Sequence, residues 1–125
     1  MGVLSAVVID CRMAPALARF WAGVIEGYAV RAYDDAEIAR LASLGFTPAT
    51  DPTVAVDGPG PTLFFQEVRE GKTSKNRVHL DIEVSDRKAQ VDRLTAQGAT
   101  VIRQFDTWTV LQDPEGNEFC LSDQR

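Results

Sequence analysis

The only histidine of the chain, His79, lies in the run "NRVHLDIEV" at 76–84, where polar and apolar residues alternate without a break. In a β-strand this alternation places Arg77, His79, Asp81 and Glu83 on one face. The other face, which we expect to be buried, carries Val78, Leu80, Ile82 and Val84. An imidazole beside carboxylates can act as a general acid or base, bind a metal ion or bind a small molecule. The alternative is a face that is only exposed to water.

The neighbours of His79 on this face have separate expected roles. Asp81 is placed to orient the imidazole ring, whereas Glu83, near the end of the predicted strand, is expected to contact only solvent. Arg77 could bind a carboxylate or phosphate through its fork of N–H donors, or form an ion pair with Asp81 or Glu118. The sequence leaves both roles of Arg77 open.

Three further side chains could have a functional role, namely the thiol of Cys120 and the indoles of Trp21 and Trp108. Cys120 has no basic cluster near it in the sequence to lower its pKa, so an inert packed thiol is favoured over a nucleophile. Trp21 falls on the apolar stripe of a predicted helix and is expected in the core. Trp108 could point either into a binding site or against a helix.

Composition excludes several classes of function. The net charge of −5 and the pI near 4.8 disfavour binding to nucleic acid, which requires a basic surface. No apolar run approaches the roughly 20 residues of a membrane span. The N-terminus lacks the pattern of a signal peptide, so we expect a cytoplasmic protein in which Cys11 and Cys120 stay unpaired. A chain of 125 residues fits one domain.

In the first half, apolar periodicity and turn residues predict a strand at 3–10 and then a helix that begins near Pro15 and ends at Gly27. Asp34 and Glu37 have the spacing of a capping box. The remaining elements predicted here are a strand at 28–33, a helix at 34–45, and a hairpin of strands at 53–56 and 62–68.

The second half repeats this order of elements. A strand at 77–84 precedes a helix at 85–98, in which Val91 and Leu94 face inward and Gly98 ends the helix. Three further strands are predicted at 100–105, 108–113 and 117–122, the last two joined by the turn "DPEG". Each half is therefore a strand, a helix and three strands.

This order, together with "LARFWAGVIEG" after the first strand, "NRVHLDIEV" and the closing "DPEGNEFCL", resembles the vicinal oxygen chelate superfamily, and within it the glyoxalase-like domains. The resemblance implies an α+β fold in which two βαβββ modules form a cupped mixed sheet with helices on its convex side. It implies a single domain over 1–125, with module one at about 1–70 and module two at about 76–125.

Metal-dependent members of the superfamily place ligands on the first and last strands of each module. The resemblance puts these positions at Ala6, Gln66, His79 and Cys120, or at Ser5 if the first is shifted by one residue. Only His79 is a typical ligand, although an amide oxygen and a thiolate can also bind metals. Candidate metal ligands are therefore His79, Gln66, Cys120 and, as a partial substitute, Glu118. The incomplete set favours a site without a metal, although a divalent metal cofactor is possible.

The resemblance thus implies a protein that binds a small organic molecule in the cup of its sheet. Phe64 and Gln66 are assigned to the cup because Gln66 needs a polar partner or solvent. The predicted ligand-binding residues are Arg77, His79, Asp81, Phe64, Gln66, Trp108, Glu118 and Cys120, with His79 as the candidate catalytic residue. The alternative is a metal-dependent lyase, isomerase or dioxygenase-like enzyme. The expected partners are the small-molecule ligand and a second copy of the chain in a homodimer, with neither nucleic acid nor membrane.

Overall fold

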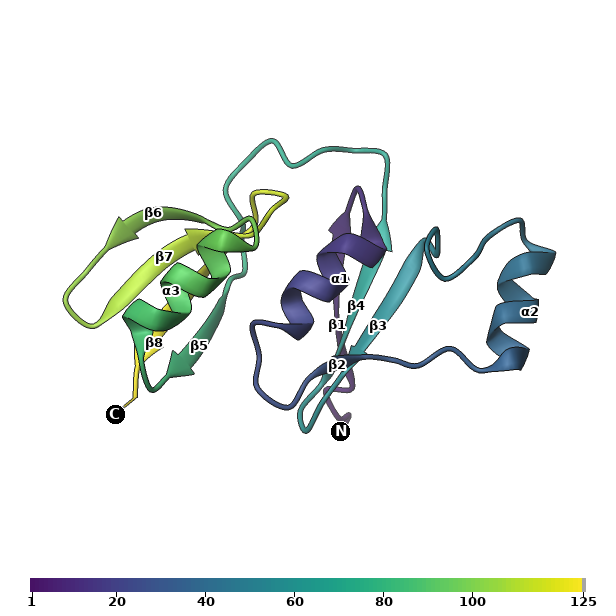
Figure 1. Ribbon diagram of the computed structural model, residues 1–125, viewed down its shortest axis with the longest axis horizontal. Helices are drawn as coiled ribbons and strands as arrows, with labels where there is room; N and C mark the ends of the chain where they lie inside the picture. The colour runs from purple at the N-terminus through teal and green to yellow at the C-terminus, as the bar shows by residue number, and fades with distance from the viewer. Residues whose placement is uncertain (125) are drawn as a thin grey trace. The chain divides into compact units, whose positions relative to one another are not determined.

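The computed structural model describes residues 1–124 (Figure 1). In each half of the chain a strand and a helix are followed by three strands, and in the first half a second helix lies between the first two of these three strands. The two halves lie in separate compact units, Met1–Gly71 and a second that begins at Lys72. This arrangement confirms the predicted α+β class with two βαβββ modules. That both modules make one domain stays a prediction.

The first unit contains a four-stranded sheet with the strand order β1-β4-β3-β2. Its elements are β1 (Ala6–Cys11), α1 (Ala14–Ala22), β2 (Ala29–Val30), α2 (Asp35–Ser43), β3 (Thr53–Asp57) and β4 (Thr62–Glu67). β1 pairs with β4 in parallel, and the other neighbours are antiparallel. Helix α1 packs on the sheet, where Leu17, Trp21, Val56 and Phe65 are almost completely buried. Trp21 is therefore a core residue, as predicted.

Helix α1 is shorter than predicted. It ends at Ala22, because the amide of Gly23 donates to the carbonyl of Phe20 three residues earlier, 3.0 Å away, and closes the last turn tightly. Gly27 lies in the following turn with a φ of +79°, a value that glycine adopts readily. The strand predicted at 28–33 is correspondingly reduced to Ala29–Val30.

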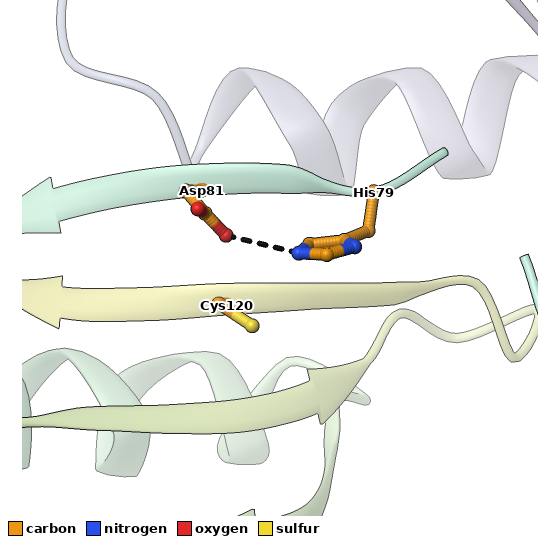
Figure 2. Close-up of side chains that lie close together, drawn as sticks. All are labelled: His79, Asp81 and Cys120. Atoms are coloured by element: carbon orange, nitrogen blue, oxygen red, sulfur yellow. Dashed lines mark ion pairs between the residues drawn. The ribbon is translucent and has the colours of Figure 1, made fainter. Parts of the chain in front are cut away.

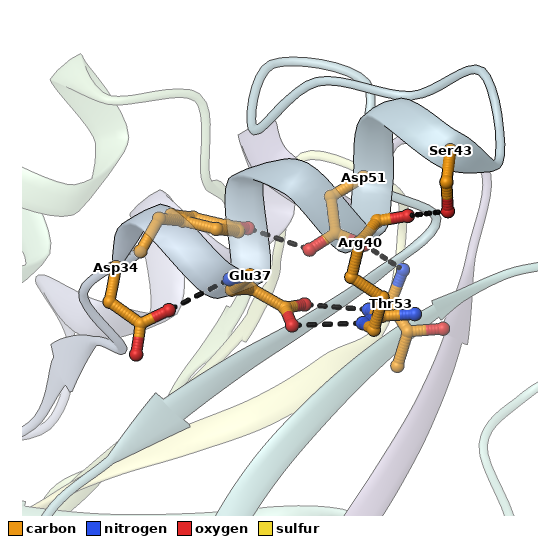
Figure 3. A network of polar contacts seen from close by, with 7 residues as sticks. Asp34, Glu37, Arg40, Ser43, Asp51 and Thr53 are labelled. Carbon is orange, nitrogen blue, oxygen red and sulfur yellow. Dashed lines mark hydrogen bonds and ion pairs between the residues drawn. The ribbon is translucent and has the colours of Figure 1, made fainter.

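Helix α2 has only half of the predicted capping box. The Asp34 carboxylate accepts a hydrogen bond from the Glu37 amide at 2.8 Å (Figure 3), as an N-cap does. The Glu37 side chain does not reach back; it pairs instead with Arg40, at 2.6 Å. Leu41 is the buried residue of this helix, which is otherwise exposed or half-buried.

The second unit contains a four-stranded sheet with the order β5-β8-β7-β6. Its elements are β5 (Leu80–Val84), α3 (Arg87–Ala96), β6 (Thr100–Gln104), β7 (Trp108–Gln112) and β8 (Glu118–Asp123). Helix α3 crosses the sheet (Figure 1), and the inward-facing Val91 and Leu94 are buried as predicted. Phe119 and Leu121 of β8 are completely buried, so alternation along β8 separates a core face from the opposite face.

Strand β5 begins later than predicted. The pairing of β5 with β8 begins at Leu80, which lies opposite Phe119, and no residue before Leu80 is paired with β8. Arg77, Val78 and His79 therefore precede the strand. The prediction that Val78 is buried is wrong, because 75% of this residue is exposed.

The turn between β7 and β8 is held by its first residue. The Asp113 carboxylate accepts hydrogen bonds from the amides of Glu115 and Asn117, at 2.9 and 3.0 Å. Gly116 has a φ of +90°, which explains the glycine in "DPEG". The predicted turn is confirmed, and it brings β8 back antiparallel to β7.

Two further expectations concern the described residues as a set. In the described residues neither Cys11 nor Cys120 is part of a disulfide, in line with the expectation of unpaired thiols. No helix in the described part of the chain is long and apolar enough to cross a membrane.

Candidate functional site

The face of the second sheet that points away from α3 is built by β5 and β8 in parallel register. Asp81 lies opposite Cys120, and Glu83 lies opposite Ser122. On the next strand Val110 is the partner of Cys120. Because side chains alternate between the two faces of a sheet, these groups share the face opposite the buried Phe119 and Leu121.

His79 and Asp81 lie side by side at the start of β5, with the imidazole turned toward the carboxylate (Figure 2). The His79 Nε2 atom is 3.2 Å from Asp81 Oδ1, and the two side chains are 47% and 67% exposed. When Nε2 carries a proton it donates to Asp81, which fixes the ring and leaves Nδ1 as the acceptor of a neutral imidazole. The predicted orienting role of Asp81 fits this geometry.

Cys120 lies on the neighbouring strand, close to the same pair (Figure 2). Burial raises the pKa of the Cys120 thiol above its ordinary value, and the charge and hydrogen bond of Asp81 raise it further. A raised pKa keeps the thiol protonated at neutral pH, whereas a cysteine nucleophile needs the thiolate. The environment therefore favours the inert thiol predicted from the sequence over a nucleophile.

These three side chains could also hold a metal ion. One potential ligand atom from each of His79, Asp81 and Cys120 lies within 4.8 Å of the other two, and they form the one such group found in the described residues. Nitrogen, oxygen and sulfur ligands suit zinc, which at bond lengths of about 2.0–2.3 Å needs a somewhat tighter cluster. The set shares His79 and Cys120 with the one that the family resemblance implied, and it adds Asp81.

A cavity of about 490 Å³ opens at this face, and we call it the Trp108 cavity. Its volume falls within the range of small-molecule sites. Its lining residues are His79, Asp81, Thr107, Trp108, Cys120, Ser122, Asp123 and Gln124. The structure thus brings together four of the predicted ligand-binding residues, His79, Asp81, Trp108 and Cys120.

Trp108 forms the aromatic wall of this cavity, which answers the open question of where it points. The Phe105 ring stacks on it with a centroid distance of 4.3 Å and an angle of 13° between planes. On Phe105 in turn lies the guanidinium of Arg103, 4.6 Å from the ring centroid. Trp108 nevertheless remains 39% exposed, so it keeps surface for a ligand.

Arg87, the first residue of α3, holds the segment that carries Trp108. Its guanidinium donates to the carbonyls of Phe105, at 2.9 Å, and Asp106, at 2.6 Å. It also donates to the buried hydroxyl of Thr109, at 3.1 Å, and to the carboxylate of Asp123, at 2.9 Å. A single side chain therefore connects α3, the turn between β6 and β7, and the end of β8.

Glu118 belongs to a different part of this unit. Its carboxylate accepts a hydrogen bond from the Asn76 amide at 3.0 Å and pairs with Lys72 at 3.1 Å. Burial alone would raise the pKa of Glu118, but the backbone hydrogen bonds and Lys72 outweigh it and lower the pKa. Glu118 lines a second cavity of about 530 Å³, the Glu118 cavity, with Lys72 and Lys75 among its other lining residues. Its partners favour a structural role.

Of the remaining predicted residues, Arg77 belongs to the second unit, and Phe64, Gln66 and Ala6 belong to the first. Arg77 is exposed and lines neither of the two cavities. Phe64 and Gln66 belong to β4 of the first unit. Phe64 is half-buried beneath the guanidinium of Arg31, 5.7 Å from the ring centroid, and Gln66 is exposed. Ala6 pairs with Thr62 at the start of the same sheet and offers no metal ligand.

Four residues of the Trp108 cavity, Thr107, Ser122, Asp123 and Gln124, were missed by sequence reasoning. For Ser122 a signal existed, because it follows Cys120 by two positions in a strand that alternates. The other three flank strand ends, and no periodic pattern identifies such positions. The sequence did not indicate the role of Arg87 either, because an arginine at the start of a helix is common.

The sequence matches a known protein family over most of its length. The model of a family described as "Glyoxalase-like domain" matches residues 6–122, which is nearly the whole chain. Among curated proteins, none matches the sequence.

Solved structures with the same fold come from several bacteria. A glyoxalase/bleomycin resistance protein/dioxygenase family enzyme from Burkholderia phytofirmans PsJN has a TM-score of 0.70 at 21% identity, covering 98% of each chain. A glyoxalase-related enzyme from Fulvimarina pelagi has a TM-score of 0.66 at 16% identity, covering 99% of this chain and 89% of its own. The fosfomycin resistance protein FosX from Mesorhizobium loti has a TM-score of 0.66 at 11% identity, with 99% and 92% covered.

Proposed function

The chain belongs to the glyoxalase-like domain family, and on that basis we propose that it binds a small organic molecule in the Trp108 cavity, without a complete metal site. The observation that carries the proposal is the convergence of His79, Asp81 and Trp108 on one cavity of suitable size. Ligand sites combine an apolar wall with a few placed polar groups, and this cavity has both.

Each residue has a distinct role in the proposed site. Trp108 supplies a flat apolar surface for stacking. His79, oriented by Asp81 at 3.2 Å, offers a ring nitrogen that can accept or deliver a proton. Should the bound molecule be a substrate, His79 is the general acid or base. Cys120 supplies a small protonated thiol to the floor of the cavity.

Binding can be tested on the full chain with a thermal-shift screen of a fragment library, beside native mass spectrometry of freshly purified protein. We expect at least one compound to stabilise the wild type and to lose its effect in Trp108→Leu and His79→Ala. Lys88→Ala is the matched control, because this side chain is 87% exposed on α3. A screen in which no fragment stabilises the wild type, and no small molecule co-purifies, contradicts the proposal.

The second candidate function is a metal-dependent lyase, isomerase or dioxygenase-like enzyme. One observation favours it, namely the cluster of His79, Asp81 and Cys120, which could hold a divalent metal with an open coordination position. A bound metal would supply Lewis-acid chemistry there. The state of the Cys120 thiol argues against a metal site. A metal ion binds the thiolate, and the raised pKa of Cys120 makes loss of the thiol proton less favourable.

Elemental analysis of protein purified without chelator or metal-affinity tag separates the two candidates. We expect less than a stoichiometric amount of transition metal per chain, because Ala6 and Gln66 leave the four-position set of the superfamily incomplete. One equivalent of zinc, nickel, iron or manganese that disappears in His79→Ala would overturn this expectation and establish the metalloenzyme.

The proposal includes a cytoplasmic location, supported by Cys11 and Cys120, which are not joined in a disulfide in the described residues. Cell fractionation with an antibody against the chain tests it directly. Recovery in a secreted or membrane fraction would contradict the location without affecting the proposed site.

A further inference from the structure

We propose that the Trp108 cavity selects planar organic cations; this inference rests on the proposed function and names the class of compound that the site takes. It combines two features of the cavity, the charges that line it and the aromatic ring that walls it.

The charged groups that line the cavity are carboxylates. Asp81 and Asp123 both line it. Lys72 and Lys75 line the Glu118 cavity, although the charge of Lys75 also acts on Cys120. The charge of Asp123 is offset by Arg87 at 2.9 Å. Asp81 has His79 as its partner, and a neutral imidazole leaves the carboxylate charge in place. A cation in the cavity is therefore attracted by Asp81, and an anion of the same shape is repelled.

The aromatic wall favours a flat cation over a compact one. Phe105 stacks on one side of Trp108 and already carries the Arg103 guanidinium, 4.6 Å from its own centroid. The exposed surface of Trp108 meets the cavity, and indole is the side chain that attracts cations most strongly. A planar delocalised cation can stack on the indole and approach Asp81 at once.

Hydrogen bonding adds a preference for cations that carry N–H groups. With Nε2 of His79 directed to Asp81, Nδ1 of the neutral ring is an acceptor, and the Asp81 carboxylate is another. An amidinium or guanidinium group presents donors in one plane, which can reach such acceptors while the attached ring lies on Trp108.

Three nearly isosteric probes test the inference: benzamidine as the planar cation, benzamide as the neutral analogue and benzoate as the anion. Each is titrated at pH 8 and low ionic strength into the ¹⁵N-labelled full chain, followed by amide and indole chemical shifts. We expect benzamidine to bind about tenfold more tightly than benzamide, with benzoate weakest. Asp81→Asn should remove the difference between benzamidine and benzamide, and Trp108→Leu should weaken both.

Asp92→Asn is the control, because it removes the same charge from an exposed position on α3 and should leave all affinities unchanged. Benzamide or benzoate binding as tightly as benzamidine, with the same loss in Trp108→Leu, would overturn the cation preference and leave the small-molecule site intact. A benzamidine preference that survives in Asp81→Asn would overturn the assignment of the cation selectivity to Asp81. If none of the probes shifts the cavity resonances while the fragment screen yields binders there, the cation class is wrong; if the screen is also empty, the proposed function fails with it.

Discussion

The chemistry of the candidate site depends on how three neighbouring side chains influence one another. Asp81 orients His79 and, together with burial, raises the pKa of the Cys120 thiol. The same carboxylate thus contacts the imidazole and helps to keep the thiol protonated. A site that contains histidine, aspartate and cysteine is for this reason better suited to binding or proton transfer than to covalent catalysis.

The influence of Asp81 on Cys120 predicts a measurable change in thiol reactivity. At pH 7–8 the wild-type thiol should react slowly with iodoacetamide, because the raised pKa reduces its thiolate fraction. Asp81→Asn removes a negative charge, lowers the pKa and should accelerate alkylation, with the rate profile displaced to lower pH. Cys120→Ser identifies any background from the buried Cys11. Equal rates in wild type and Asp81→Asn would show that the carboxylate does not control the thiol.

Truncating the exposed polar residues beside β5 should hardly change stability. His79 is 47% exposed in its side chain and Arg77 is exposed, so His79→Ala and Arg77→Ala remove little packing. Thermal melts should therefore be close to the wild type, while His79→Ala changes ligand binding. A buried polar network would instead lose about 1–3 kcal/mol per truncation, and melts lowered to that extent in both variants would make this segment structural.

Among the elements, helix α3 does more than cover its sheet. Its first residue, Arg87, links it to the carbonyls of Phe105 and Asp106 and to the side chains of Thr109 and Asp123. The segment fixed in this way contains Thr107 and Trp108, which line the cavity. Arg87 belongs to the helix that covers one face of the sheet, and it thus positions Trp108, the wall of the cavity on the other face.

Arg87→Lys tests this positioning while keeping the positive charge. An ammonium group cannot reproduce the planar fork, so several of the four acceptors lose their donor, and we expect a loss of about 1–2 kcal/mol in the free energy of unfolding. Urea denaturation followed by tryptophan fluorescence measures it, with Lys88→Ala as the neighbouring control. A substitution as silent as the control would show that packing of α3, rather than the guanidinium, holds the segment.

At the scale of the whole molecule, the two sheets have outer strands that offer backbone groups for pairing. β1 and β2 are outermost in the first sheet, and β5 and β6 in the second. The outer strands of sheets are commonly covered in native proteins, in many cases by a second copy of the chain. The sheet edges therefore support the homodimer implied by the family resemblance.

We expect size exclusion with light scattering to give about twice the chain mass of 13.7 kDa. The measurement should extend over a hundredfold range of concentration, since a weak dimer dissociates on dilution. A mass near 14 kDa throughout that range would refute the homodimer and leave the proposed site in the second unit unaffected.

Local periodicity in the sequence predicted the order of the elements and most of the buried positions in them. Alternation in 117–122 identifies Phe119 and Leu121, which are fully buried, and helical spacing identifies Val91 and Leu94. Glycine marks the end of α3 at Gly98, with a φ of +108°. Each of these signals involves residues only a few positions apart, so each can be recognised within a single strand or helix.

Which of the candidate residues lie next to one another depends on the tertiary structure. Asp81 and Cys120 are adjacent because β5 and β8 pair in one particular register, and a shift of one residue would turn each side chain to the other face. β5 begins only at Leu80, so Val78 lies before the strand and is exposed against the alternating pattern. Where Trp108 points likewise depends on Arg87, about twenty residues away. These arrangements follow from backbone hydrogen bonds and packing between segments distant in the sequence, and no local pattern encodes them.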